Sequence, residues 1–352
     1  MKRILITGGC GFIGSHTSLR LLEKGYNIII IDSLVNSSFE AIKNIKYILK
    51  KTHPDYIKNL NFIKGDIRDK DLINNIFSES YRSQKKIDAV MHFAGIKSVY
   101  ESILNPLDYW DVNLFGTINL LKEMRKFNCK NFIFSSSATI YGHSEDLPFT
   151  EDSKIKPINT YGKTKSAVEQ LLIDLFQSKE KDWKIASLRY FNPIGAHSTG
   201  LLGEDPKNIP NNIFPLINKV AAKEIQKFKI YGNDWDTKDG TGIRDYIHIM
   251  DLSEGHLNVL EFLLKNQPQT LFLNLGTGKG TSVLELIKTF EKVNKIKIPY
   301  IFKGKREGDI ACAFADNSLA KNILDWEPKR NLEDMCKDGW NWYINSKINK
   351  KL

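Results

Sequence analysis

The sequence predicts an α/β fold in which a doubly wound parallel sheet carries helices on both faces. Short apolar runs at residues 4–6 and 28–31 are typical of buried strands. Between them, residues 15–24 show the leucine spacing of a helix, which Gly25 ends. Further strands are expected at residues 60–63, 89–92, 132–135 and 185–190. Buried strands that alternate with helices favour a parallel sheet covered on both sides.

The character of the sequence changes after about residue 191. Glycine, proline and asparagine concentrate in residues 191–212 and again in 232–242. A strand at 272–275 and helices at 283–293 and 332–344 are expected to follow. We therefore expect a second, smaller lobe of mixed α/β structure, lying over the carboxyl ends of the strands, where open α/β sheets bind ligands.

The overall composition excludes several classes of function. The chain has 352 residues, of which 41% are apolar, and a formal net charge of +10. Its lysines are spread along the sequence, so no nucleic-acid-binding surface is expected. The four cysteines show neither metal-ligand nor disulfide spacing, so no metal is expected. No leader or membrane-spanning run is visible, and we expect no membrane partner and a cytoplasmic location.

A glycine-rich turn between the first strand and the first helix predicts a dinucleotide site. Gly8, Gly11 and Gly14 form a G-x-x-G-x-x-G pattern, which permits a tight turn and close approach of the backbone to a pyrophosphate. The following helix offers N–H groups to the phosphates. Asp32 ends the next strand, where a carboxylate binds the adenosine ribose and favours NAD over NADP. The alternative is that Asp32 is simply a turn residue.

Other residues at strand ends are candidates for the same site. Small or polar residues follow the third and fourth strands, where a backbone can pass close to a cofactor. For Asn113 alone, a local backbone cap is an equally good explanation. The full set of cofactor-binding candidates is Gly8, Gly11, Phe12, Ile13, Gly14, Asp32, Asp66, Ile67, Phe93, Ala94, Gly95, Lys97, Asn113, Tyr161 and Lys165.

Tyr161 and Lys165 predict acid–base chemistry. Four residues apart on a helix, the phenol and the ammonium share one face. A positive charge beside a phenol stabilises the phenolate, which would make Tyr161 a usable base near neutral pH. Residues 135–137 are three serines at the end of a predicted strand, and one of these hydroxyls can bind a substrate oxygen beside Tyr161.

These motifs resemble the extended short-chain dehydrogenase/reductase superfamily, and within it the UDP-glucose 4-epimerase family. The resemblance covers nearly the whole chain in order. It rests on residues 7–16 (TGGCGFIGSH), 92–95 (HFAG), 135–142 (SSSATIYG), 189–193 (RYFNP), 242–248 (GIRDYIH) and 306–309 (REGD).

The resemblance implies a fold, a cofactor and a reaction. The fold would be a Rossmann-type domain of residues 1–190 plus about 245–275, which binds NAD. Residues of about 191–244 and 276–352 would form a lobe that binds the UDP-sugar. The family retains its NAD, oxidises C4 of the sugar to a ketone and returns hydride to the other face. Ser137 would be the catalytic serine, with Tyr161 as the base. Lys165 would bind the nicotinamide ribose and lower the pKa of Tyr161.

The same resemblance assigns the substrate contacts. Arg244 and Arg306 would clamp the diphosphate, as fork-shaped and permanently charged side chains do. Ala313 matches a wall of the sugar pocket, and its small size suggests activity on UDP-GlcNAc and UDP-GalNAc as well, unless neighbouring side chains fill the space. The substrate-binding candidates are Ser137, Tyr161, Asn192 and Asn212 near the diphosphate and sugar, Tyr231 at the uracil, Arg244, Arg306, Asp309 at the uridine ribose, and Ala313.

Three alternative functions remain at this stage. A sugar-nucleotide 4,6-dehydratase would commonly carry Asp-Glu after the strand-end serine, whereas this chain has Ala138 and Thr139. A decarboxylase or epimerase of UDP-hexuronic acids would need a further pocket for the C6 carboxylate, which the sequence does not exclude. A non-catalytic NAD-binding sensor would have no need of Ser137, Tyr161 and Lys165.

The resemblance also implies a homodimer built from two helices of each subunit. Residues 105–126 and 160–179 would be those helices. Ordinary core packing would use the same apolar residues, so both interpretations stay open here. The candidate side chains are Leu120, Leu121, Leu171, Leu172 and Phe176.

Overall fold

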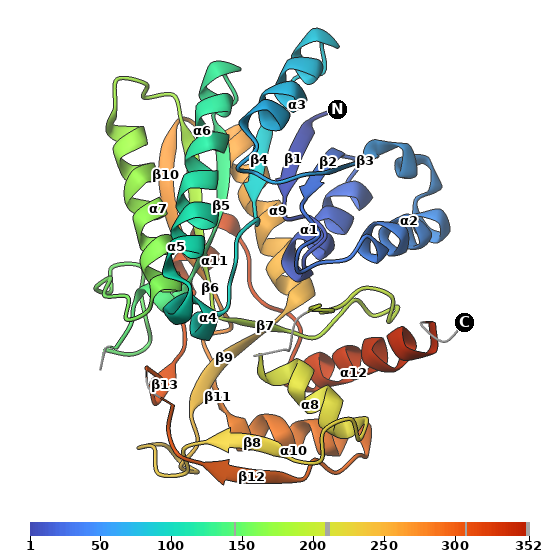
Figure 1. Cartoon of the computed structure of the whole chain (residues 1–352), viewed down its shortest axis with the longest axis vertical. Coiled ribbons are helices and arrows are strands. Elements are labelled where there is room, and N and C mark those ends of the chain that lie inside the picture. The colour runs from blue at the N-terminus through green and yellow to red at the C-terminus, as the bar shows by residue number, and fades with distance from the viewer. Residues whose placement is uncertain (144–145, 208–211, 307, 350–352) are drawn as a thin grey trace. The chain divides into compact units, whose positions relative to one another are not determined.

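The computed structural model of the chain describes residues 1–143, 146–207, 212–306 and 308–349. It divides into two compact units, which Figure 1 shows together. The first unit comprises Met1–Gly142, Ile155–Arg189 and Ser253–Leu273, and the second comprises His143–Lys154, Tyr190–Leu252 and Asn274–Leu352.

The first unit is built around a sheet of seven strands in the order β10-β6-β5-β4-β1-β2-β3. Pairing is parallel between β1 and β2, β2 and β3, β1 and β4, and β4 and β5. The order reverses between β1 and β4, which makes the gap between their carboxyl ends a topological switch point. The strands are β1 (Arg3–Thr7), β2 (Asn27–Asp32), β3 (Leu60–Lys64), β4 (Ala89–His92), β5 (Asn131–Ser137), β6 (Lys184–Tyr190) and β10 (Gln269–Leu275).

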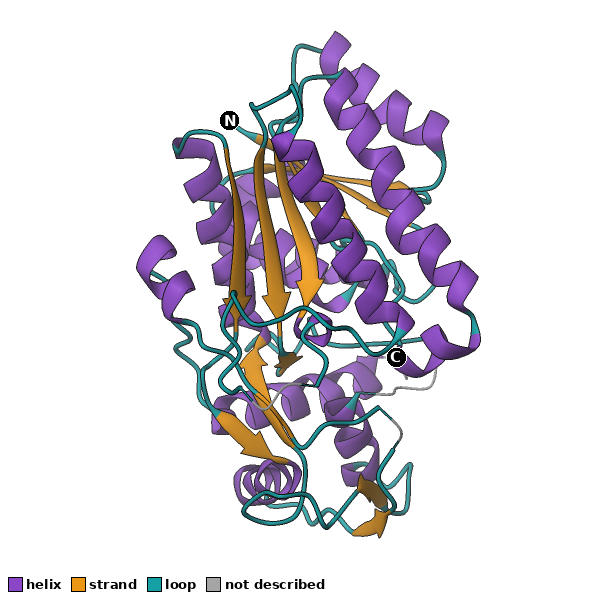
Figure 2. Cartoon of the chain, turned by 90° about the vertical axis from the view of Figure 1, so that its left-hand side faces the viewer, coloured by secondary structure: helices purple, strands orange, loops and turns teal. Residues whose placement is uncertain are grey.

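Helices cover both faces of this sheet (Figures 1 and 2). The longer ones are α1 (Phe12–Glu23), α2 (Glu40–Thr52), α3 (Lys70–Arg82), α6 (Gly116–Lys126), α7 (Thr160–Gln177) and α9 (Ile249–Lys265). The shorter ones are η1 (Pro54–Asn59), α4 (Val99–Leu104), α5 (Pro106–Tyr109), η2 (Trp110–Phe115) and η3 (Ala138–Ile140). The predicted α/β class with a doubly wound parallel sheet is confirmed.

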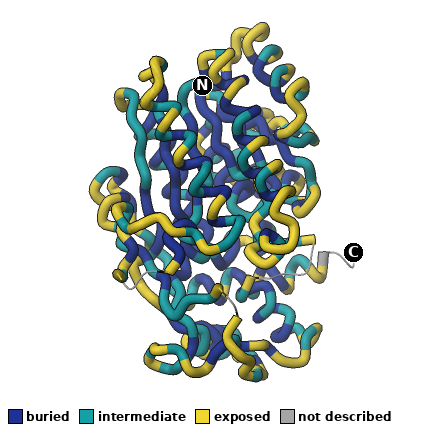
Figure 3. Tube along the Cα trace, turned by 60° about the vertical axis from the view of Figure 1, so that its left-hand side comes forward, coloured by how far each residue is buried: buried dark blue, intermediate teal, exposed yellow. Residues whose placement is uncertain are grey.

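The core of the first unit follows the alternation of side chains along each strand. Leu5, Ile29 and Ile31 join a buried cluster with residues of α3, α6 and α7. Their neighbours Ile4 and Ile30, both fully buried, point to the opposite face. The edge strands β3 and β10 are partly exposed, but β1, β2 and β4 are covered on both faces and are buried along most of their length (Figure 3). This explains why they appear in the sequence as unbroken apolar runs rather than as alternating patterns.

The structure differs from the expected helix over residues 105–126. That segment is divided into α5, the π-helix η2 and α6. The proposed dimer residues Leu120, Leu121 and Leu172 are buried in the core of the first unit, and Leu171 and Phe176 pack against it. The core-packing interpretation therefore applies to them, because these are the side chains that cover the sheet.

The second unit is a smaller mixed α/β assembly with its own core. Strand β9 pairs antiparallel with β11 and parallel with β7 and β13, and β8 pairs parallel with β12. Its apolar cluster joins these strands to α8, α10 and α12. The elements are β7 (Asn192–Ile194), α8 (Ile213–Ala221), β8 (Phe228–Tyr231), β9 (Ile243–His248), β11 (Gly280–Ser282), α10 (Val283–Asn294), β12 (Tyr300–Lys303), β13 (Cys312–Ala313), α11 (Ser318–Leu324) and α12 (Leu332–Asn349). None of the described helices is both long and apolar enough to traverse a bilayer.

Candidate active site

The glycine turn lies at the carboxyl end of β1, next to the end of β4. Gly8 has a φ of 69°, and a Cβ atom there would lie 2.6 Å from the backbone nitrogen of Ala94. A Cβ atom on Gly14 would lie 2.4 Å from the carbonyl oxygen of Gly8. Both positions therefore require glycine for the backbone to turn and for α1 to approach it closely.

The first turn of α1 is suited to a pyrophosphate. The helix begins at Phe12 after Gly11, and no side chain in the described structure caps its N-terminus. The N–H groups of a first helical turn have no carbonyl partner within the helix, and the helix dipole adds positive charge there. The backbone of Phe12 and Ile13 therefore presents donors to an anion, as a dinucleotide requires.

Asp32 is the last residue of β2, and its carboxylate is held against the glycine turn. One oxygen accepts from the N–H of Cys10 at 2.9 Å, and the other accepts from the N–H of Leu34 at 2.9 Å and the hydroxyl of Ser37 at 2.7 Å. A carboxylate oxygen can accept more than one hydrogen bond. This fixed, buried carboxylate beside a pyrophosphate turn fits the two hydroxyls of an adenosine ribose.

The candidates after β3 are engaged with protein neighbours. The carboxylate of Asp66 accepts from the guanidinium of Arg68 at 2.7 and 3.0 Å, and this partner lowers the pKa of Asp66. Ile67 is buried and packs against Gly116, where an added Cβ would lie 2.6 Å from it.

Asn113 joins the loop after β4 to helix α7, which carries Tyr161 and Lys165. Its side chain accepts from the N–H of Ile96 at 2.9 Å and donates to the Ile96 carbonyl and the Thr164 hydroxyl, both at 3.1 Å. A Cβ on Gly95 would lie 2.9 Å from the amide oxygen of Asn113. Both amide hydrogens are therefore used within the protein, which matches the capping interpretation of Asn113 rather than a direct donation to a cofactor.

The other candidates after β4 lie on the same loop. The N–H of Phe93 donates to the Thr7 carbonyl at 3.0 Å, which extends the pairing of β4 with β1 by one residue. The Phe93 ring lies 4.9 Å from that of His256. The N–H of Ala94 reaches the Thr7 hydroxyl at 3.3 Å. Lys97 is exposed.

Ser137, Tyr161 and Lys165 come together where α7 packs on the end of β5. The Lys165 ammonium donates to the carbonyl of Ser135 at 2.7 Å and lies 5.7 Å from the centre of the Tyr161 ring. The Tyr161 hydroxyl lies close enough to that of Ser137 for the serine to affect its pKa, and the Ser137 hydroxyl itself accepts from the Thr139 hydroxyl at 3.0 Å. The helix begins with Asn159, whose side chain caps the N–H of Gly162 at 2.8 Å, so Tyr161 is held in a capped first turn.

The pKa of Tyr161 is shifted in the opposite direction from the one expected from the sequence. Burial raises the pKa of Tyr161 to about 12, although the hydrogen bond from Ser137 acts in the opposite direction. Burial also lowers the pKa of Lys165 to about 8, partly offset by Glu169. The predicted lowering of the tyrosine pKa is therefore not present in the ligand-free chain. The ammonium is directed at a carbonyl oxygen, and desolvation of the phenol dominates.

In the second unit, Arg306 lies between two other substrate candidates. Its guanidinium donates to the carboxylate of Asp309 at 3.0 Å and lies 4.3 Å from the centre of the Tyr231 ring. Arg244 on β9 donates to the Ile243 carbonyl at 2.7 Å. Strand β13 pairs Ala313 with Arg244, so the two residues are adjacent across the sheet. Glu307, which belongs to the same motif, lies outside the described residues.

The two asparagine candidates also belong to the second unit. Asn192 begins β7 and pairs with Tyr246 on β9. Asn212 is the residue before α8, and its amide donates to Glu204 at 2.8 Å.

Comparison with known proteins places this geometry in a family. A family model described as GDP-mannose 4,6 dehydratase matches residues 5–339. UDP-glucose 4-epimerase of Bacillus subtilis (strain 168) is 48% identical over 339 residues, which are 96% of each chain. The chain belongs to the UDP-glucose 4-epimerase family.

Solved structures agree with this assignment. UDP-glucose 4-epimerase from Stenotrophomonas maltophila, with bound NAD and formylated UDP-arabinopyranose, has a TM-score of 0.93 at 42% identity and covers 99% of this chain and 100% of its own. The enzyme from Bifidobacterium longum, in complex with NAD+ and UDP, has a TM-score of 0.91 at 44% identity, with coverage of 98% and 99%. The resemblance inferred from the motifs is confirmed.

The dehydratase description of the family model does not carry over to the site. In this member of the epimerase family, η3 follows Ser137 directly and contains Ala138 and Thr139. Neither side chain exchanges a proton near neutral pH. The chain therefore has no acid and base at the position where a dehydratase would need them.

Sequence reasoning missed a buried ion pair behind the proposed catalytic residues. Glu169 and Arg189 are 2% and 3% exposed and lie 2.8 Å apart. Glu169 stands four residues after Lys165, and Arg189 opens the 189–193 motif. The spacing of Tyr161, Lys165 and Glu169 along one helix face was the signal that could have found it.

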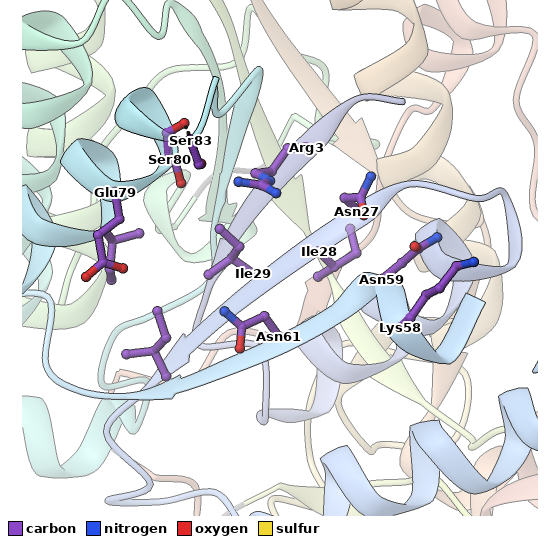
Figure 4. A pocket seen from close by; sticks show the side chains of 12 residues that line it. Arg3, Asn27, Ile28, Ile29, Lys58, Asn59, Asn61, Glu79, Ser80 and Ser83 are labelled. Carbon is purple, nitrogen blue, oxygen red and sulfur yellow. Dashed lines mark hydrogen bonds between the residues drawn. The ribbon is translucent and has the colours of Figure 1, made fainter. Parts of the chain in front are cut away.

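The first unit also contains a pocket beside the first residues of β1 and β2 (Figure 4). It has a volume of about 310 Å³ and is lined by Arg3 and Asn27, which begin β1 and β2, and by Glu79 and Ser80 of α3. The amino ends of parallel strands face away from the edge where open α/β sheets bind ligands. This pocket is therefore separate from the candidate active site.

Proposed function

We propose that this chain is an NAD-dependent UDP-glucose 4-epimerase, an isomerase that inverts C4 of a UDP-hexose. The observation that carries the proposal is the grouping of Ser137, Tyr161 and Lys165 at the end of β5, in the same unit as the pyrophosphate turn. Membership of the UDP-glucose 4-epimerase family supports the same reaction.

The first unit is proposed to hold NAD. The residues fit it, because Gly8 and Gly14 have no room for a side chain, the N-terminus of α1 offers donors, and Asp32 is a fixed carboxylate. Oxidised nicotinamide, when bound, supplies a carbon that accepts and returns hydride, together with a positive charge.

The chain's own residues then have separate tasks. Tyr161 takes the proton from the sugar 4-hydroxyl and later returns it, so one group serves as base and acid. Because burial raises the pKa of Tyr161, a positive charge must lie close to the phenol for it to act as a base. Ser137 binds the same sugar oxygen, and Lys165 binds the nicotinamide ribose and contributes positive charge.

The second unit is proposed to bind the UDP moiety. Arg306, Asp309 and Tyr231 lie together and combine a cation, a carboxylate and an aromatic ring, which suit a diphosphate, a ribose and a uracil. Arg244, Asn192 and Asn212 are the further proposed contacts. Firm binding of the nucleotide would leave the sugar free to turn over between the two hydride transfers.

The proposed function is tested by incubating the protein with UDP-galactose deuterated at C4 and no added cofactor. We expect UDP-glucose that keeps its deuterium, with no net NADH, because hydrogen is borrowed and returned within one site. Loss of the deuterium to solvent, or a dehydrated product, would contradict the proposal. A non-catalytic sensor would give no product at all.

Activity on N-acetylated sugars is proposed from Ala313, which by the family resemblance would stand at a wall of the sugar pocket, where a small side chain would leave room for an acetamido group. We expect the unmodified protein to interconvert UDP-GlcNAc and UDP-GalNAc as well as UDP-glucose and UDP-galactose. Ala313→Tyr is expected to lower kcat/KM for the acetamido sugars by about 100-fold or more, because the tyrosine ring would occupy the space that the 2-acetamido group needs. Ala313→Ser is the matched small control. Equal losses for both sugar classes in the tyrosine variant would contradict this specificity role.

We also propose a homodimer, formed through the first of the two predicted segments, residues 105–126, and the helix before it, but by other side chains than those expected from the sequence. An apolar patch is exposed on α4, α5 and η2, close to α7. Patches of exposed large apolar residues mark interaction surfaces. The patch consists of Val99, Tyr100, Ile103, Leu104, Leu107 and Phe115, with exposures between 40% and 81%.

The dimer is tested by placing a charge in this patch. Leu107→Asp combined with Leu104→Asp is expected to convert a dimer into a monomer that still folds, because both side chains are exposed in the single chain. Light scattering measures the mass. The exposed Tyr81→Asp, outside the patch, is the control. A monomeric mass for the unmodified protein, or a dimer that survives both charges, would contradict the patch as the interface.

A cytoplasmic location is proposed on the state of the cysteines. All four are free thiols in the structure, and three of them are buried. Free buried thiols are usual for proteins in a reducing compartment.

A further inference from the structure

One face of α7 is fastened to three successive serines of β5. Tyr161, Lys165 and Glu169 are spaced four residues apart and therefore project from the same side of the helix. Each of them contacts a different serine at the end of the strand. The contacts are the hydroxyl of Ser137 to Tyr161, the carbonyl of Ser135 to Lys165, and the hydroxyl of Ser136 to Glu169.

Glu169 accepts hydrogen bonds at both of its carboxylate oxygens. Its Oε1 accepts from the Ser136 hydroxyl at 2.6 Å and from Nε of Arg189 at 3.1 Å, and its Oε2 accepts from Nη2 of Arg189 at 2.8 Å. The remaining end of the guanidinium donates to the Tyr141 hydroxyl at 3.0 Å. Arg189 comes from β6, so the pair joins the helix to two strands.

We propose that Glu169, fixed by Arg189, is a positioning residue for the epimerisation proposed above, holding α7 against β5 so that Lys165 and Tyr161 face Ser137. A carboxylate bound at both oxygens allows neither rotation nor sliding of the helix. The serines are consecutive, so a shift of α7 by one position would break all three contacts together.

Stability alone does not explain this pair. Burying two charges costs most of what their attraction returns, and a well-packed apolar pair is often as stable. Glu169 and Arg189 are almost completely buried. A buried ion pair can instead serve to fix one arrangement of the elements that it joins. Here those elements include α7, which carries Tyr161 and Lys165, the residues proposed to act on the sugar and the cofactor.

Glu169 also sets the charge around Lys165. From α7 the ammonium faces Tyr161 and Glu169, and from β4 it faces His92, whose pKa is lowered to about 3 by burial and by Lys165. Arg189 and Tyr141 stand behind Glu169. Tyr161 and His92 are neutral near pH 7, so among these groups the negative charge is that of Glu169. Burial lowers the pKa of Lys165 to about 8 and Glu169 opposes this shift.

The test removes both charges while keeping the volume filled. The double variant Glu169→Gln, Arg189→Met leaves no unpaired buried charge and keeps an acceptor for Ser136. Binding of NADH is measured by its fluorescence between pH 6.5 and 9.5, and kcat for UDP-galactose is measured over the same range. We expect the pH at which NADH affinity falls to move down, because the variant loses Glu169, which raises the pKa of Lys165, and Arg189 is not among the groups that shift that pKa. We expect the alkaline limb of kcat to move in the same direction.

The matched control is another buried carboxylate paired with an arginine. Asp251 is 2% exposed and accepts from the backbone N–H groups of Lys329 and Arg330 in the second unit. Asp251→Asn is expected to lower the unfolding temperature and to leave both pH midpoints unchanged.

The outcomes separate this proposal from the proposed function. A folded double variant with unchanged NADH midpoint and unchanged kcat profile overturns the role of Glu169. If the double variant does not fold, Ser136→Ala removes one of the hydrogen bonds that fix Glu169 but keeps its charge, so we expect kcat to fall while both pH midpoints stay unchanged; an unchanged kcat overturns the proposal. If the unmodified protein binds NADH but does not convert UDP-galactose, the proposed function fails, and the NADH midpoints still decide for or against Glu169.

Discussion

Tyr161→Phe is expected to lower kcat by roughly 10²- to 10⁴-fold, the range that a positioned acid–base group contributes. The substitution removes one oxygen and keeps the ring. The ring contributes to packing beside the Lys165 ammonium, 5.7 Å from its centre. Binding of NAD and of UDP should therefore remain within a few-fold of the unmodified protein. The measurement is steady-state conversion of UDP-galactose, together with calorimetric titration of UDP.

The matched control for this prediction is Tyr26→Phe. Tyr26 is a partly buried phenol whose pKa is raised by burial, as is that of Tyr161, but it lies after α1 and away from β5. Its loss should leave kcat unchanged. Full activity of Tyr161→Phe would show that another group moves the proton, and a variant that loses NAD as well would show that the phenol has a mainly structural role.

Gly8→Ala is expected to abolish retention of NAD and to destabilise the first unit. The added methyl would lie 2.6 Å from the backbone nitrogen of Ala94, and the φ of 69° is costly for any L-residue with a side chain. Backbone strain of this kind costs about 1–3 kcal/mol, before the clash with the end of β4 is relieved. Because Gly8 stands at the switch point, relief of the clash must separate β1 from β4 or distort the pyrophosphate turn.

This prediction has a control within the same chain. A Cβ atom on Gly304 would meet nothing within 4 Å, so Gly304→Ala should leave both the unfolding temperature and the NAD content unchanged. NAD content is measured by absorbance of the supernatant after denaturation. If Gly8→Ala retains NAD at the unmodified level, the turn that we describe is not the pyrophosphate site.

The fold was largely predictable because its signals are local. The runs at residues 4–6 and 28–31 correspond to β1 and β2, each of which is longer by one residue at either end, since strands covered on both faces consist of successive apolar residues. The glycine turn was predictable for a similar reason, because Gly8 and Gly14 are required by backbone geometry. The π-helix at 110–115 was not predictable, since its spacing of apolar residues resembles that of an α-helix.

What the sequence could not provide is depth of burial. The spacing of Tyr161 and Lys165 predicted their proximity, but the sign of the tyrosine pKa shift depends on how completely the phenol is desolvated. The same limit applies to the predicted dimer residues. Helix α6 follows a segment with apolar residues on more than one side, and only the packed structure shows that Leu120 faces the sheet while Leu107 faces outward.

The division of the first unit among three stretches of chain has a consequence for synthesis on the ribosome. Strand β10 forms an edge of the sheet beside β6, yet it is reached only at residues 269–275, after much of the second unit has been made. Until then the flank of β6 presents unpaired backbone groups to other chains. Nascent protein shorter than this should be prone to association and dependent on chaperones, and a premature stop before β10 should yield insoluble product.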